Sequence, residues 1–382
     1  MNDVTIIINC TVAQTRAALV VDDIVRRFWF GAPRGSEGLE TMPLSGERYC
    51  GRITARDQSG DGFFVDIGNG ATVYMRAGSG KENLSVGAYT LLQIQSGPRE
   101  AKNAVGVFVE SCEKASFGMV GPRADAIVQA VDAFDEPAAS IVTDDGAGVA
   151  LLRAVVPDCE VAHEPTSLFE RYGVGEALSE SFAECVSLPG GARLHFHETE
   201  GGVLIDVDTG GRDGASTHQL RKTINRNAAA RIALEIERRN LAGQILIDFL
   251  KMSRRVQSEF SDELRVIFGS ASYGGWTRTG IYGFTRMRRG VSLLEQATET
   301  GVDAPTPGRR FTLNWQLRAM FTEVEIALRA DARAQFTVSL GYELDAALTQ
   351  RQEWLDALRA RYAARFTFVG SQMMAPRDYS IV

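Results

Sequence analysis

Two short apolar segments, each ending in an aspartate, constrain the fold of this 382-residue chain more than any other feature. The first reads LIDVDTGG and carries Asp206 and Asp208, and the second reads ILIDFL and carries Asp248. An amphipathic pattern with the period of a helix runs between them, over residues 217–240. A strand, a helix and a second strand of this length make the two strands neighbours in one sheet. We therefore expect the three carboxylates to lie close together.

The chemistry of these carboxylates indicates a site for a divalent cation. Asp206 and Asp208 are spaced i, i+2, so they point to the same face of a strand. Mg²⁺ takes one or two protein carboxylates and completes its shell with water and phosphate oxygens. Such an ion can orient a water and polarise a phosphate. The alternative is that each aspartate caps a helix or closes a turn.

The charge distribution indicates a polyanionic partner. The net charge is −7, but residues 251–290 contain eight basic and three acidic residues. Residues 212–239 contain seven basic and three acidic residues. A local basic excess on an acidic protein is typical of a nucleic-acid binder. A solvated helix face would give the same pattern.

Residues 46–110 contain five short alternating segments separated by turn residues, which predicts a small closed barrel such as an OB-fold. Phe64 and Tyr74 lie on neighbouring strands of this barrel, with Arg99 and Lys102 further along. Exposed aromatic rings stack unpaired bases, and basic side chains follow the nucleic-acid backbone. The alternative is that both rings belong to the barrel core.

The remaining patterns complete an α/β, multidomain chain. Residues 4–24 predict a strand, a turn and a second strand, ALVVDDIV, and residues 121–165 predict a helix, a strand and a helix. Residues 291–310 lose periodicity and gather Thr, Pro and Gly, as in a linker. Residues 311–382 alternate helix and strand twice, which predicts a separate small α/β domain.

Other residue types exclude several classes of site. The five cysteines are odd in number, far apart and without a CxxC pair, so we expect reduced thiols rather than a zinc site or disulfides. His195 and His197 have no third ligand nearby in sequence, and we expect exposed strand positions. No apolar run approaches the ~18 residues of a membrane span, and the start lacks the basic region of a signal peptide. We therefore expect a cytoplasmic protein without a membrane partner.

Several of these segments resemble one known family. TEGGVLIDVDTGG, RRNLAGQILIDFLKM and the upstream LFERYGVGEALSESFAECVSLPGGARLHFHETE are similar to the catalytic core of the ribonuclease E/G family. The OB-fold RNA-binding module of the family resembles the segment GERYCGRITARDQSGDGFFVDIGNGATVYM. Its small KH-like domain resembles the segment ALRADARAQFTVSLGYELDAALTQ.

The resemblance implies a domain order. An RNase H-like domain would occupy residues 1–45 and 111–200, with the OB-fold inserted at 46–110. A DNase-I-like catalytic subdomain would follow at 201–290, a linker at 291–310 and the KH-like domain at 311–382.

The resemblance also implies an activity and a metal site. The activity is Mg²⁺-dependent endonucleolytic cleavage of single-stranded, AU-rich RNA in mRNA decay or in rRNA or tRNA precursor processing, leaving a 5′-phosphate and a 3′-hydroxyl. Mn²⁺ is the alternative metal. Asp206 and Asp248 fall on the two metal-binding aspartates, and Asp208 falls where the family usually has an assisting Asn. Glu200 falls on a family acidic position, and Asn225 lies in the matching helix, so both are candidates for a second shell.

In the barrel, Phe64, Tyr74 and Lys102 fall on the RNA-contacting positions of the family, with Arg99 nearby.

Two family features are missing from the sequence. The cysteine pair that links subunits through zinc has no counterpart in 291–310, so we expect no zinc, and any homo-oligomer would form without a zinc link. The insert that senses a 5′-monophosphate is also missing, and Ile281 stands where the family has its sensing Arg, so we expect cleavage that is insensitive to the 5′-phosphate. The alternative, from another class, is an RNA-binding protein or RNA chaperone that keeps the fold and cleaves poorly.

Overall fold

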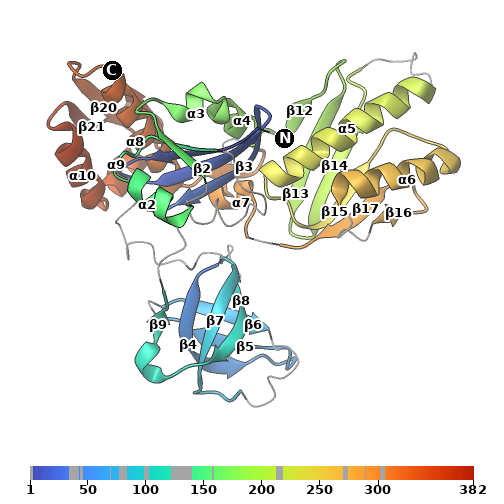
Figure 1. Cartoon of the computed structure of the whole chain (residues 1–382), viewed down its shortest axis with the longest axis horizontal. Coiled ribbons are helices and arrows are strands. Elements are labelled where there is room, and N and C mark those ends of the chain that lie inside the picture. The colour runs from blue at the N-terminus through green and yellow to red at the C-terminus, as the bar shows by residue number, and fades with distance from the viewer. Residues whose placement is uncertain are drawn as a thin grey trace. The chain divides into compact units, whose positions relative to one another are not determined.

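The computed structural model describes residues 3–33, 43, 46–68, 70–76, 84–98, 103–121, 140–156, 159–211, 218–269, 274–288, 290–301 and 306–382. The chain forms two compact units. The first comprises Met1–Thr41, Arg123–Ala177 and Ala297–Val382, and the second Met42–Pro122 and Leu178–Gln296. Both units contain strands and helices (Figure 1), which confirms the mixed α/β class. Within the described ranges, no helix is long and apolar enough to cross a bilayer.

The first unit is built on a five-stranded sheet in the order β11-β10-β1-β2-β3. The strands are β1 (Val4–Cys10), β2 (Thr15–Val21), β3 (Ile24–Gly31), β10 (Ser140–Thr143) and β11 (Glu160–His163). The first three are antiparallel, whereas β10 and β11 run parallel to β1. The helices are α2 (Val149–Val155), α3 (Leu168–Arg171) and α4 (Val174–Glu180), of which α4 spans the sequence boundary between the two units. The helix expected before β10 lies outside the described residues.

One strand prediction in this sheet was wrong. The segment ALVVDDIV was expected to be a single strand, but it contains the end of β2 and the start of β3. Asp22 and Asp23 form the turn between them with φ angles of 49° and 62°. Aspartate tolerates the left-handed region better than most residues, and a two-residue turn of this kind matches the twist of a hairpin.

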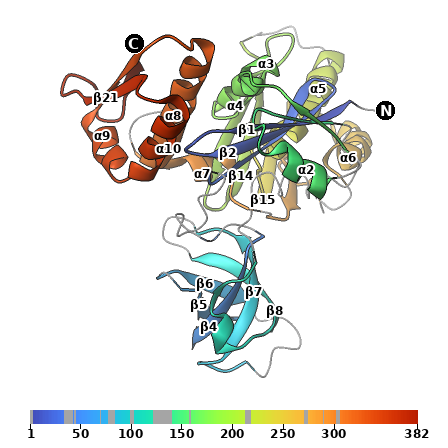
Figure 2. The same cartoon turned by 60° about the vertical axis from the view of Figure 1, so that its left-hand side comes forward.

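The C-terminal elements of the first unit form a smaller layer with its own core. They are β18 (Thr298–Thr300), β19 (Arg309–Phe311), α8 (Leu313–Ala330), β20 (Phe336–Leu340), α9 (Tyr342–Thr349), α10 (Gln352–Tyr362), β21 (Phe366–Gly370) and β22 (Tyr379–Ile381). Val12 and Ala13, from the turn after β1, pack into this core beside Phe321, and Figure 2 shows the layer beside the strands β1 and β2. The segment expected to be a linker, 291–310, contains α7 (Leu293–Ala297), β18 and the start of β19.

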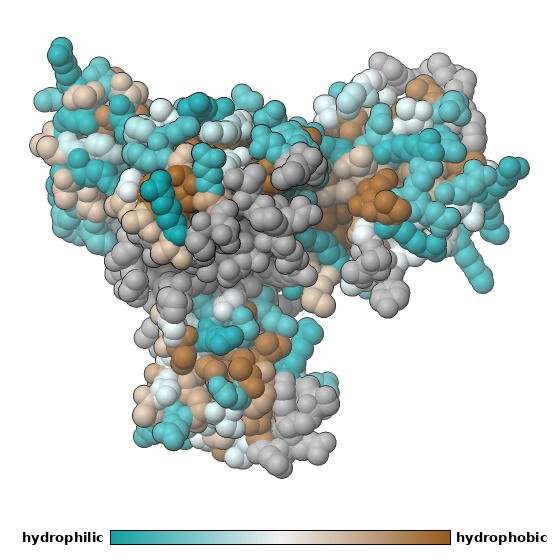
Figure 3. All heavy atoms as spheres, in the orientation of Figure 1, coloured by the Kyte–Doolittle hydropathy of each residue, from teal (hydrophilic) through white to brown (hydrophobic). Residues whose placement is uncertain are grey.

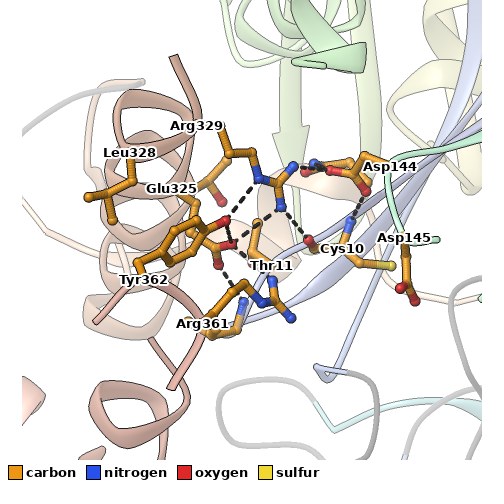
Figure 4. A network of polar contacts seen from close by, with 12 residues as sticks. Cys10, Thr11, Asp144, Asp145, Glu325, Leu328, Arg329, Arg361 and Tyr362 are labelled. Carbon is orange, nitrogen blue, oxygen red and sulfur yellow. Dashed lines mark hydrogen bonds and ion pairs between the residues drawn. The ribbon is translucent and has the colours of Figure 1, made fainter. Parts of the chain in front are cut away.

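A buried polar network joins this layer to the five-stranded sheet (Figure 4). Asp144, at the end of β10, accepts hydrogen bonds from the Asn9 side chain (2.6 Å) and from the Cys10 amide (2.8 Å), and pairs with Arg329 of α8 at 2.5 Å. Glu325, also on α8, accepts a hydrogen bond from the Val12 amide at 2.6 Å. Because these carboxylates are buried, their partners are needed to offset the loss of hydration.

The second unit contains the predicted barrel. Its elements are β4 (Arg48–Arg56), β5 (Gly62–Asp66), β6 (Thr72–Arg76), β7 (Tyr89–Ser96), β8 (Ala104–Ser111), the 3-10 turn η1 (Lys114–Ser116) and β9 (Gly118–Met119). The sheet order is β5-β6-β8-β7-β4, and pairing of β5 with β4 closes the ring. Phe63, Val65 and Met75 fill the interior. The five strands and their closure confirm the small barrel expected from the sequence.

The expectation that all five cysteines are reduced was wrong. Cys50 and Cys112 form a disulfide across a sequence separation of 62 residues. Cys112 directly follows β8, and the chain after it returns to β4, where β9 pairs Met119 with Tyr49. Barrel closure therefore brings together two cysteines that no local sequence signal relates. The free cysteines are Cys10, Cys159 and Cys185.

The second unit also contains a six-stranded sheet in the order β12-β13-β14-β15-β17-β16. Its strands are β12 (Cys185–Ser187), β13 (Arg193–Thr199), β14 (Gly202–Asp208), β15 (Gly243–Asp248), β16 (Gly275–Trp276) and β17 (Tyr282–Arg286). Only β14 and β15 pair in parallel among these described strands. The helices α5 (His218–Arg238) and α6 (Arg254–Phe268) cover one face (Figure 1). Ile232, Ile205 and Ile247 are among the fully buried residues of this core.

Candidate active site

Asp206 and Asp248 are direct neighbours in the six-stranded sheet. β14 and β15 run parallel, and their register pairs these two aspartates. Ile205 and Ile247, which precede them, are fully buried in the core shared with the helices. Because side chains alternate along a strand, both aspartates point to the opposite face, which we call the exposed face of the sheet. The structure thus brings together two of the three predicted carboxylates.

The two carboxylates are electrostatically coupled. Desolvation, and then the negative charge of Asp206, raise the pKa of Asp248. A carboxylate whose pKa is raised in this way gains from a nearby positive charge. The pair therefore fits a divalent cation, whose binding would offset the repulsion between the two side chains.

Asp208 lies on the same face but further along β14. In the backbone register, Asp208 lies opposite Arg193 of β13. On the other side of β14, strand β15 ends at Asp248, so no residue of β15 lies opposite Asp208. Within the part of the chain that the structure describes, no group of three His, Cys, Asp or Glu side chains is placed to hold a metal ion. The site therefore offers a pair of carboxylates, a number that Mg²⁺ commonly takes from a protein.

Glu200 is not part of this pair. It is exposed in the turn between β13 and β14, at the end of β14 opposite to Asp206. A strand rises about 3.3 Å per residue, so the six steps between the two residues amount to roughly 20 Å. Glu200 therefore cannot support the Asp206 carboxylate directly.

Asn225 fixes the chain that leaves the site. This residue is fully buried on α5. Its side-chain amide donates to the Leu250 carbonyl at 2.9 Å and accepts from the Leu250 amide at 3.0 Å. Phe249, between Asp248 and Leu250, packs edge-to-face on Phe260 of α6. Asn225 thus positions the backbone two residues beyond Asp248.

A row of four polar side chains crosses the exposed face. The register pairs Cys185 with His195, His195 with Asp206, and Asp206 with Asp248. Side chains opposite each other on paired strands lie on the same face. The sequence indicated two exposed histidines on one strand, but it gave no sign that His195 is aligned with the aspartates. That alignment depends on the register of four strands, which no local pattern records.

The basic segments are largely neutralised by acidic side chains. Arg226 of α5 forms a two-pronged ion pair with Glu263 of α6, and hydrogen bonding from this guanidinium lowers the pKa of Glu263. Arg255 pairs with Glu259 at 3.2 Å. By contrast, Lys251 and Arg254 are exposed and have no acidic partner among the described residues. These two cations follow Asp248 by three and six residues.

Phe64 and Tyr74 lie outside the barrel core. They face each other across β5 and β6, with ring centroids 5.5 Å apart in an edge-to-face arrangement. Both are half-buried, whereas their neighbours Phe63 and Met75 point inward. Desolvation, and then Asp57, raise the pKa of Tyr74, whose hydroxyl donates to Asp57 at 3.3 Å. Figure 3 shows further apolar side chains on the surface of the barrel, the lowest part of the picture.

Two predicted RNA contacts, Arg99 and Lys102, lie outside the described residues. Of the four barrel residues expected to contact RNA, the structure describes Phe64 and Tyr74.

The segment that contains the acidic pair is similar to proteins of one known family. Residues 111–289 match the Ribonuclease E/G family. The chain is 27% identical over 199 residues to ribonuclease E of Nostoc sp., an alignment that covers 47% of this chain and 29% of the relative. It is 34% identical over 134 residues to ribonuclease G of Haemophilus influenzae, covering 33% and 27%. Ribonuclease E of Synechocystis sp. is 30% identical over 155 residues, covering 38% and 22%. The matched stretches thus span less than a third of each of these relatives.

Proposed function

We propose that this chain, which matches the ribonuclease E/G family over residues 111–289, is a metal-dependent endoribonuclease acting on single-stranded RNA. The observation that carries the proposal is the in-register pair Asp206 and Asp248 on the exposed face of the sheet. Two coupled carboxylates in one row favour a cation-binding site over a structural role, because without a cation their repulsion is unfavourable.

The proposed metal is Mg²⁺, with Mn²⁺ as the alternative. Asp206 and Asp248 would hold it through carboxylate oxygens, and Asp208 on the same strand would contribute negative charge nearby. A bound divalent cation supplies Lewis acidity toward a phosphate and lowers the pKa of water. Asn225 keeps the chain after Asp248 in place, which limits how far that carboxylate can move from Asp206. The products by this proposal carry a 5′-phosphate and a 3′-hydroxyl.

The proposed substrate is unpaired, AU-rich RNA from messengers or from rRNA or tRNA precursors. Phe64 and Tyr74 offer ring surface outside the barrel core, and base stacking on an aromatic ring requires an unpaired base. Arg99 and Lys102 are proposed to track the phosphates. The missing insert and Ile281 support cleavage that ignores the 5′-phosphate state of the RNA. Any homo-oligomer is proposed to form without zinc.

The proposed domain identities follow the sheets. The order β3-β2-β1-β10-β11, with three antiparallel strands followed by two parallel ones, supports an RNase H-like domain. The closed barrel supports the inserted OB-fold. The sheet that carries Asp206 supports the DNase-I-like catalytic subdomain. The KH-like domain is supported by the C-terminal layer, which contains α8, α9, α10 and β20 to β22.

Cleavage of an end-labelled, AU-rich single-stranded RNA tests this function. Internal cuts should require Mg²⁺, disappear with chelator, and fall by at least about 100-fold in Asp206→Asn and Asp248→Asn, since a lost metal ligand removes several kcal/mol of transition-state stabilisation. Asp262→Asn is the matched control, because Asp262 is an exposed aspartate on α6 that pairs only with Arg265 among the described residues. Tight RNA binding without cuts, equal in all four proteins, would contradict the proposal and indicate an RNA-binding protein.

A further inference from the structure

The row formed by Cys185, His195, Asp206 and Asp248 extends beyond the proposed metal ligands in one direction only. β13 and β12 continue it with His195 and Cys185, and neither side chain is acidic. On the other side, β17 begins with the buried Tyr282, which pairs with Ile247 rather than with Asp248. The polar row therefore leads away from the acidic pair toward β12.

His195 is available to a ligand. Its side chain is half-buried on the exposed face, and its ring Nε2 lies 4.0 Å from Cys185 Sγ, a weak contact. No hydrogen bond joins His195 to Asp206 in the described structure, although their strands are paired at these residues. The imidazole therefore keeps a nitrogen-bound hydrogen to donate.

His197 is a natural contrast. It lies two residues further on the same strand and the same face, but its Nδ1 lies 3.0 Å from Glu184 Oε1. It stands in the row of Leu204 and Leu246, not in that of the aspartates. His197 therefore shares the residue type, strand and face of His195 without its alignment.

We propose that the RNA strand crosses the sheet along the row and that His195 binds the phosphate next to the one that is cleaved. The inference rests on the proposed function, because it takes the space between Asp206 and Asp248 as the position of the cleaved phosphate. Neighbouring strands are about 4.8 Å apart, so His195 stands about 7 Å from that position, one nucleotide step along an unstacked strand. An imidazole N–H donates readily to a phosphate oxygen, and it does so without requiring a positive charge.

The direction of the row supports this path. A polyanion approaching two carboxylates is repelled except where a cation or a donor lies beside them. On the strands paired with β14, His195 is the side-chain donor whose backbone lies directly opposite Asp206. The neighbouring Cys185 is exposed and uncharged as a thiol, so it leaves room for the strand to continue.

The test compares His195→Ala with His197→Ala on three RNAs of one sequence. One RNA is unmodified, and the others carry a neutral methylphosphonate at the phosphate on the 5′ or the 3′ side of the cleaved one. His195→Ala should lower kcat/KM on the unmodified RNA by about tenfold, the effect of one hydrogen bond to a charged group. The same loss should vanish on one of the two modified RNAs, while His197→Ala should cleave all three like the unsubstituted protein.

Two further measurements keep the inference separate from the proposed activity. His195→Asn, which retains a side-chain donor, should recover part of the lost rate. RNA affinity in chelator, where no cleavage occurs, should fall in His195→Ala for the unmodified RNA and for one of the modified RNAs, and it should not change for the modified RNA on which the kinetic loss vanishes. A protein that binds RNA without cutting it would contradict the proposed catalysis, while these affinities would still decide the role of His195. Equal losses on all three RNAs, or none, would overturn the inference.

Discussion

The side-chain amide of Asn225 binds both backbone polar groups of Leu250, two residues beyond Asp248. This bidentate contact reaches from the middle of α5 to the end of β15, so a helix residue fixes the exit of the strand that carries a proposed metal ligand. Asn225 is fully buried and both hydrogen bonds are partly buried, so water would replace these two bonds poorly.

Asn225→Ala is therefore expected to affect stability and activity together. Loss of the two bonds leaves the partly buried N–H and C=O of Leu250 without these partners, and we expect the free energy of unfolding to fall by about 2 kcal/mol. Cleavage at a temperature where the variant is still folded should fall as well, because the backbone two residues beyond Asp248 is no longer fixed. Urea unfolding and single-turnover cleavage measure the two effects. Thr223→Ala, which removes an exposed hydroxyl on the same helix, should change neither.

Removal of the Asp248 charge should stabilise the protein in chelator. Desolvation, and then the charge of Asp206, raise its pKa above the ordinary value of an aspartate, so the folded state binds the proton more strongly than the unfolded chain does. The resulting stability is present below the unfolded pKa and is lost as the pH rises through the folded pKa. At neutral pH, Asp248→Asn should therefore raise Tm in chelator and abolish the further rise that Mg²⁺ gives the unsubstituted protein. A lower Tm in chelator would show that Asp248 has a structural role instead.

The closeness of Asp206 and Asp248 could be predicted from the sequence, because it depends on short patterns that are adjacent in the chain. Each aspartate ends an apolar segment, and the helix between the segments makes the two strands neighbours. The alignment of His195 with Asp206 could not be predicted, since it depends on a register set by turns and by packing over the whole sheet. The pairing of Arg226 with Glu263 was equally hidden, because α5 and α6 meet only after folding. For the same reason, the count of basic residues in the sequence overestimates the positive charge on the surface, because many of these side chains form ion pairs in the folded chain.

Lys251 and Arg254 should contribute to RNA affinity more than their paired neighbour Arg255. Both are exposed close to Asp248 without an acidic partner in the described structure, whereas Arg255 is bound to Glu259. Lys251→Ala and Arg254→Ala should each weaken binding and reduce the slope of log K against log salt by about 0.7, the value for one phosphate of a single strand. Arg255→Ala should leave the slope nearly unchanged. Salt titrations by fluorescence anisotropy, in chelator, make this comparison, and equal slopes in all three variants would argue against a phosphate contact.

Phe64 and Tyr74 should act on binding rather than on stability. Each ring is half-buried outside the barrel core, so Phe64→Ala and Tyr74→Ala should each weaken binding of single-stranded RNA by about 1–3 kcal/mol, the range for loss of one stacked base. Binding of a fully paired RNA should change little. Phe63→Ala serves as the contrast, because Phe63 is a core residue with 2% exposure, and its loss should lower stability by about 3–5 kcal/mol.

The disulfide predicts a barrel whose stability depends on the redox state. It joins Cys50 and Cys112 across 62 residues, and a loop of that length corresponds to about 4 kcal/mol of chain entropy in the unfolded state. Reductant should therefore lower the midpoint of barrel unfolding in the unsubstituted protein, but not in the double variant Cys50→Ala, Cys112→Ala. Cys185→Ala, which removes an exposed free thiol, should keep the full response to reductant. Titration of the unreduced, denatured protein should find three thiols, and a count of five, with no effect of reductant, would show that the two cysteines are not joined.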